Sequence, residues 1–67
     1  MTNTDELEKI IASSGLKKEF IAEQLGITAM SLYNKINNIR EFKASEIQKL
    51  SDILKIKDKH NIFFFES

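Results

Sequence analysis

Apolar residues recur at helical spacing along most of the chain. Within residues 5–14, a spacing of three and four positions places one apolar stripe on a helix, made by Leu7, Ile10 and Ile11. Thr4 precedes two acidic residues and is expected to cap this helix. Gly15 is expected to end it, because glycine adopts the left-handed conformation of a helix C-cap at low cost.

A second helix is predicted over residues 18–25, with three side chains facing inward: Phe20, Ile21 and Leu25. Gly26 is expected to close it in the left-handed conformation. Thr28 is a suitable N-cap for a third helix that runs to about Asn37, with Leu32 and Ile36 on its inner face. Two short helices joined by a tight glycine turn form a helix-turn-helix, in which Ala22 provides a small contact at the crossing.

A fourth helix is predicted over about residues 44–55, with an apolar stripe made by Ile47, Leu50, Ile53 and Leu54. Glu46 is the acid of a capping arrangement at its start, although Lys43 is a poor partner for it. Beyond this helix two alternatives stay open. Either Asp58 caps a short helix over 59–64, or residues 62–65 form a terminal strand.

The aromatic run Phe63, Phe64 and Phe65 has two interpretations. One is a lid over a small core, and the other is a contact between two copies of a homodimer. Three adjacent rings cannot all face one core from a helix or a strand, so at least one ring is expected to be exposed in a monomer.

These elements predict an all-α fold, a compact bundle of about five short helices. The domain is expected to span residues 1–67, with a Phe-rich C-terminal segment over 58–67. A chain of this length buries only about 60% of the surface that its unfolded form exposes. Disulfides are excluded by the absence of Cys, and a single His makes a zinc site improbable. Helix packing, self-association or both must therefore stabilise it.

Composition argues against several classes of protein. The polar, acidic start "MTNTDELEK" is not a signal peptide, and no apolar run approaches the roughly 20 residues of a membrane helix. We therefore expect a cytoplasmic protein without a membrane partner. No nucleophile–base pair, Gly-rich phosphate loop or metal-ligand cluster is visible, which predicts no enzymatic activity, no catalytic or metal residues, no cofactor and no small-molecule substrate.

Charge is distributed unevenly although the formal net charge is zero. Residues 17–43 are the only net basic third, with five basic and three acidic side chains. This is a modest electrostatic footprint for a protein that binds nucleic acid.

The stretches "KEFIAEQLGITAMSLYNKINN" and "FKASEIQKLSDIL" resemble the Cro/repressor-type (XRE-like) helix-turn-helix family, especially small Cro-like regulators of temperate phages of Gram-positive hosts. The resemblance covers about residues 5–57. It implies a lambda-repressor-like DNA-binding domain, a double-stranded DNA operator as partner, a homodimer at least on DNA, and a bacterial cytoplasm. Lys18 and Ala29 stand where Gln is common in the family, and Lys35 stands where many members have an apolar residue.

The resemblance also implies roles for individual residues. The base-reading positions are Ala29, Met30, Tyr33 and Asn34. The phosphate contacts are Lys18, Thr28, Ser31, Lys35, Asn37, Asn38, Arg40 and Lys43. Asparagine pairs with adenine and alanine touches a thymine methyl group. The alternatives are an ordinary solvent-facing helix for the first set, and helix capping for Thr28 and Ser31.

A second function of a different class stays open. The same fold can serve as a protein-interaction module that binds a host factor or a cognate repressor. The zero net charge and the Phe-rich tail are the reasons to consider it.

Overall fold

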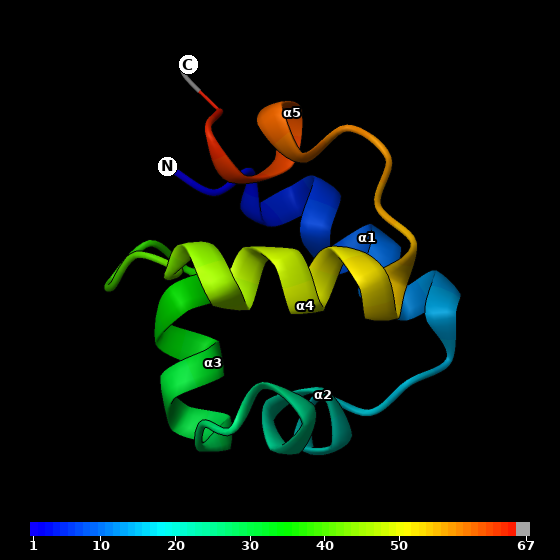
Figure 1. Ribbon diagram of the computed structural model, residues 1–67, viewed down its shortest axis with the longest axis vertical. Coiled ribbons are helices and arrows are strands. Elements are labelled where there is room, and N and C mark those ends of the chain that lie inside the picture. The colour runs from blue at the N-terminus through cyan, green and yellow to red at the C-terminus, as the bar shows by residue number, and fades with distance from the viewer. Residues whose placement is uncertain (66–67) are drawn as a thin grey trace.

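The computed structural model describes residues 1–65, and this part of the chain folds into five α-helices without a strand (Figure 1). The helices are α1 (Thr4–Ser14), α2 (Lys18–Leu25), α3 (Ala29–Ile36), α4 (Ala44–Leu54) and α5 (Lys59–Phe63). The predicted all-α class is confirmed, and the open question at the C-terminus is settled in favour of a short helix. None of these helices has the length and apolar character needed to cross a membrane.

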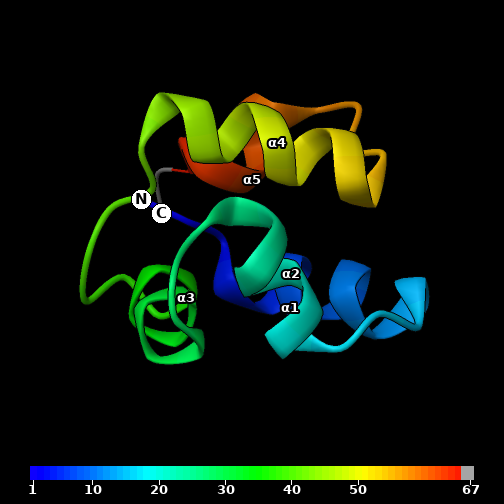
Figure 2. The same cartoon turned by 60° about the horizontal axis from the view of Figure 1, so that its bottom comes forward.

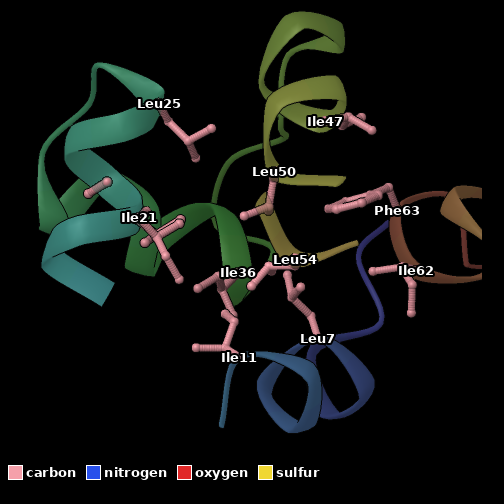
Figure 3. Close-up of a cluster of buried hydrophobic side chains, with 12 residues drawn as sticks. Leu7, Ile11, Ile21, Leu25, Ile36, Ile47, Leu50, Leu54, Ile62 and Phe63 are labelled. Carbon is pink, nitrogen blue, oxygen red and sulfur yellow. The ribbon is translucent and has the colours of Figure 1, made fainter. Parts of the chain in front are cut away.

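The core is built by apolar side chains from all five helices (Figure 3). The largest fully buried side chains are Leu7, Ile21, Leu32, Ile36 and Leu50. Helix α4 lies across the middle of the molecule and packs against α1, α2 and α5, while α3 packs against α1 and α2 (Figure 1). The inward stripes predicted for α1, α3 and α4 therefore meet in one cluster.

Caps define where most helices begin and end. Gly15 and Gly26 adopt φ angles of 74° and 73°, so both take the left-handed C-cap conformation that the sequence predicts. Asp58 caps α5 by accepting a hydrogen bond from the Asn61 N–H. The predicted cap of α1 is wrong by one residue. Asn3 accepts from the Glu6 N–H, whereas the Thr4 hydroxyl donates to the Ile36 carbonyl oxygen at 2.6 Å and ties α1 to the end of α3.

The inner face of α2 differs from the prediction at one position. Ile21, Ala22 and Leu25 are buried, but Phe20 is 45% exposed. Successive residues turn by about 100° around an α-helix, so the three buried residues occupy one arc and Phe20 lies outside it. The prediction that Phe20 faces inward is therefore wrong.

The Phe-rich segment divides its rings between the core and the surface. Phe63 is buried and packs edge-to-face on Phe42, with ring centroids 5.4 Å apart, so its prediction as a dimer contact is wrong and the lid interpretation holds for this ring. Phe64 is 53% exposed, as the argument from three adjacent rings requires. The Phe65 N–H donates to the Met1 carbonyl oxygen at 2.8 Å, which joins the two ends of the described chain. The last two residues of the predicted 58–67 segment lie outside the described residues.

Candidate nucleic-acid interface

Helices α2 and α3 pack against each other and are connected by residues 26–28 (Figure 2). The turn is held by backbone hydrogen bonds, since the Gly26 N–H and the Ile27 N–H both reach the carbonyl oxygen of Ala22. Ala22 is only 2% exposed, which fits the small side chain expected there. The turn thus sets α3 directly after α2 at one end of the molecule.

The outer face of α3 carries the four predicted base-reading residues. Met30 is 68% exposed and Tyr33 54% exposed, while Ala29 is also exposed and Asn34 is half-buried. The opposite side of the helix holds Leu32 and Ile36 in the core. A helix with two large apolar side chains on its solvent side is better suited to meet a partner than to meet water alone.

The first turn of α3 shows the capping role expected of its polar residues. The Thr28 hydroxyl oxygen accepts a hydrogen bond from the Ser31 N–H at 3.0 Å. Thr28 is exposed and Ser31 is half-buried. The Thr28 hydroxyl can still donate to a phosphate while it caps, because a hydroxyl is both donor and acceptor.

Three of the basic residues predicted as phosphate contacts remain accessible to solvent. Arg40 and Lys43 are exposed in the segment between α3 and α4. Lys18, at the start of α2, forms an ion pair with Glu8 at 2.9 Å, and both side chains are at least 40% exposed. Exposed pairs of this kind contribute about 0–1 kcal/mol, so Lys18 can exchange Glu8 for a phosphate at small cost.

Lys35 is not a surface cation, which corrects its prediction as a phosphate contact. Its ammonium group lies 2.6 Å from both carboxylate oxygens of Glu46, and the two side chains are only 8% and 7% exposed. One Glu46 oxygen also accepts from the Lys43 N–H at 2.8 Å. Burial acts to raise the pKa of Glu46, but the hydrogen bonds from Lys35 and the Lys43 backbone, with the charges of both lysines, outweigh it and lower that pKa from its ordinary 4.5.

The side chains of the two asparagines after α3 form hydrogen bonds to the protein backbone. The Asn37 side-chain amide donates to the Tyr33 carbonyl oxygen at 2.9 Å, although the residue is exposed. Asn38 adopts a φ of 64° and its side chain bonds both backbone polar groups of Thr2. These partners do not fit the predicted phosphate contact at Asn38, because its Nδ2 donates to the Thr2 carbonyl oxygen and to the Thr4 hydroxyl oxygen and its Oδ1 accepts from the Thr2 N–H.

The exposure of two large apolar residues was not predicted. Ile39 is 64% exposed in the segment that follows α3, and Phe20 projects from α2. The signal for Ile39 was its position in "NNIREF", where polar neighbours and no helical spacing surround it. Glu46 was considered only as a cap. The signal for its pairing was Lys35, a charged residue three positions after the inward Leu32, which requires a buried partner.

Comparison with known proteins adds no relative: no family model matches the chain, and neither a curated protein nor a solved structure matches it significantly. The geometry around α3 therefore carries the functional argument by itself.

Proposed function

We propose that this protein is a sequence-specific DNA-binding regulator that reads the major groove of an operator with α3. The observation that carries the proposal is the two-sided character of this helix. Leu32 and Ile36 are buried on one side, while Met30 and Tyr33 are more than half exposed on the other. The major groove is wide enough to admit an α-helix. A preceding helix joined by a short turn is the arrangement that presents such a helix to DNA.

Within this proposal, base edges and phosphates are contacted by different residues. Asn34 pairs with an adenine, Ala29 and Met30 touch thymine methyl groups, and the Tyr33 hydroxyl reaches a base or a phosphate. The proposed phosphate contacts are the exposed Thr28, Asn37, Arg40 and Lys43 and the half-buried Lys18 and Ser31. The phosphate contacts fix the register of the protein on the duplex but carry no sequence information directly.

We further propose that the regulator acts as a homodimer on a short palindromic operator and represses by occupying a promoter. A single small module reads few base pairs, whereas two-fold pairing places two reading helices about 34 Å apart, in successive major grooves. Support for a self-association surface comes from Met1 and Phe64, which are 64% and 53% exposed. Both residues line one pocket, and the Phe65 N–H, next to Phe64 in the chain, donates to the Met1 carbonyl oxygen.

A fluorescence-anisotropy titration tests the proposal. The protein is titrated against duplexes from around its own gene and against scrambled duplexes, at two salt concentrations. We expect tighter, salt-sensitive binding to one native sequence, with a log–log salt slope of about −0.9 per phosphate contact. Weak binding that is equal on both duplexes, or a flat salt response, would contradict it.

The second candidate function is a protein-interaction module. Phe20 and Ile39, 45% and 64% exposed, favour it because they add exposed apolar surface that DNA reading does not require. In that case binding of a protein partner should depend on Phe20 and Ile39 as well as on Phe64 and the 62–65 segment. It should also be insensitive to the Tyr33→Ala/Asn34→Ala pair.

A further inference from the structure

The Lys35–Glu46 pair connects three parts of the chain. Lys35 lies in the last turn of α3, and its ammonium group is bound to both oxygens of Glu46 in the first turn of α4. The same carboxylate accepts from the Lys43 N–H, where the segment after α3 enters α4. Residues 37–43, which contain the exposed Arg40, therefore run between two ends that one buried carboxylate holds together.

The pair lies on the buried side of α3, opposite the exposed face that carries Met30 and Tyr33. Lys35 shares the buried arc of this helix with Leu32 and Ile36. Apolar contacts such as these are not directional and tolerate a small rotation of the helix about its axis. Directional hydrogen bonds tolerate it less: α3 is bound through Lys35 to both Glu46 oxygens at 2.6 Å, and the Lys43 N–H holds one of these oxygens in place at the start of α4. A rotation of α3 would displace Tyr33 and Asn34 relative to a base pair.

We infer that Lys35 and Glu46 are positioning residues for DNA reading, which fix the angular setting of α3 without touching DNA. This inference rests on the proposed function. It also accounts for the use of charge at this place. A buried ion pair often adds no more stability than well-packed apolar residues of similar volume. Stability alone therefore does not explain why charged residues occupy positions 35 and 46, whereas a role in orienting α3 does.

The test replaces both residues at once, in the variant Lys35→Met/Glu46→Leu. Single replacements are unsuitable, because each leaves an uncompensated buried charge that destabilises the fold. The double replacement preserves net charge and approximate volume. We expect it to fold with a thermal midpoint close to that of the unchanged protein. Its preference for the operator over a scrambled duplex should fall by about tenfold or more, the effect of misaligning one bidentate base contact.

Two further measurements separate positioning from other roles. The salt slope of the double variant should equal that of the unchanged protein. A slope reduced by about 0.9 would mean that a phosphate contact is lost, at Lys35 or at the neighbouring Lys43, and would overturn the inference. Amide residual dipolar couplings should show α3 turned relative to α4. Ile53→Val, a mild core change in α4, serves as the stability control and should retain the full operator preference.

The outcomes distinguish this inference from the proposed function. If the unchanged protein shows no operator preference, the proposed function fails and the inference fails with it. If the unchanged protein prefers its operator and Lys35→Met/Glu46→Leu keeps the same preference with α3 unmoved, only the inference is overturned.

Discussion

The side chain of Asn38 holds both backbone polar groups of Thr2. Its Oδ1 accepts from the Thr2 N–H at 2.7 Å and its Nδ2 donates to the Thr2 carbonyl oxygen at 2.9 Å, across 36 positions of sequence. The N-terminal segment is thereby bound to the end of α3, and Thr2 is only 6% exposed. Asn38 also adopts a φ of 64°. The position therefore uses two properties of asparagine, its amide and its tolerance of the left-handed region.

Replacing Asn38 should separate these two properties. Asn38→Gly keeps the left-handed conformation and loses the two hydrogen bonds, so we expect a loss of about 1–3 kcal/mol in the free energy of unfolding. Asn38→Ala adds backbone strain and should cost about 1 kcal/mol more. Urea denaturation followed by circular dichroism measures both. Equal stability of Asn38→Gly and the unchanged protein would show that the clamp on Thr2 contributes nothing.

The outer face of α3 should be dispensable for folding and required for DNA binding. The variant Tyr33→Ala/Asn34→Ala should keep its thermal midpoint within a few degrees, because neither side chain belongs to the core. It should lose its preference for the operator, since a good bidentate base contact discriminates by about 1–3 kcal/mol. Anisotropy titration measures this, with Ser13→Ala/Gln48→Ala on exposed positions of α1 and α4 as the matched control. Intact operator binding by the first variant would mean that another surface reads the DNA.

Salt dependence should identify which surface lysines and arginines meet phosphate. Arg40→Gln and Lys43→Gln should each reduce the log–log salt slope by about 0.9 per contact, with affinity falling to a similar degree on operator and scrambled duplexes. Lys57→Gln is the control, since this exposed residue lies in the segment between α4 and α5, away from α3 (Figure 1). An unchanged slope in the first two variants would remove the loop after α3 from the interface.

Acid should weaken the contact between α3 and α4. The pKa of Glu46 is lower in the folded protein than its ordinary 4.5, so the unfolded chain takes up the proton first as the pH falls. The stability that comes from the ionised carboxylate is complete above about pH 4.5 and is lost as the pH falls through the lower, folded-state pKa. Thermal midpoints measured from pH 7 to pH 3 should therefore drop more for the unchanged protein than for Lys35→Met/Glu46→Leu. Parallel curves would contradict this.

Neighbouring phenylalanines should behave in opposite ways. Phe63→Ala should cost about 3–5 kcal/mol in the free energy of unfolding, because it removes a buried ring that packs on Phe42. Phe64→Ser should leave stability nearly unchanged and weaken self-association and cooperative operator binding. Analytical ultracentrifugation with and without operator DNA measures this. A Phe64→Ser variant that dimerises normally would exclude this ring from the proposed interface.

Helix positions were predictable because two local signals coincide. The period of the apolar residues marks the helices. Gly15 and Gly26 end two of them because glycine readily adopts a positive φ angle, which does not depend on distant contacts. The C-terminal helix was not decidable, since three consecutive phenylalanines fit neither period. Phe20 was misassigned because apolar character alone does not show whether a residue lies inside or outside the buried arc of an eight-residue helix.

The candidate site was predictable only in part. Leu32 and Ile36 mark the buried side of α3, and helical spacing then places Met30 and Tyr33 on the opposite side. The exposure of Met30 and Tyr33 could therefore be predicted from the sequence alone. Lys35 and Asn38 bind residues that are 11 and 36 positions away in the sequence. Local sequence patterns do not show which distant segment packs against the end of a helix, so these partners could not be predicted. The sequence therefore predicted which face of α3 is exposed, but assigned to DNA two polar residues that the fold itself uses.

The buried pair also constrains how this sequence can change over generations. Replacing Lys35 or Glu46 alone leaves an unpaired charge in the interior. A protein that has lost only one member of the pair should therefore fold poorly. Positions 35 and 46 should therefore covary in descendants of this chain, as a basic and an acidic residue or as two apolar ones. By contrast, Ala29, Met30, Tyr33 and Asn34 are free to diverge one at a time. If α3 reads DNA as proposed, its recognition residues can change from one operator to another while the position of the helix is inherited unchanged.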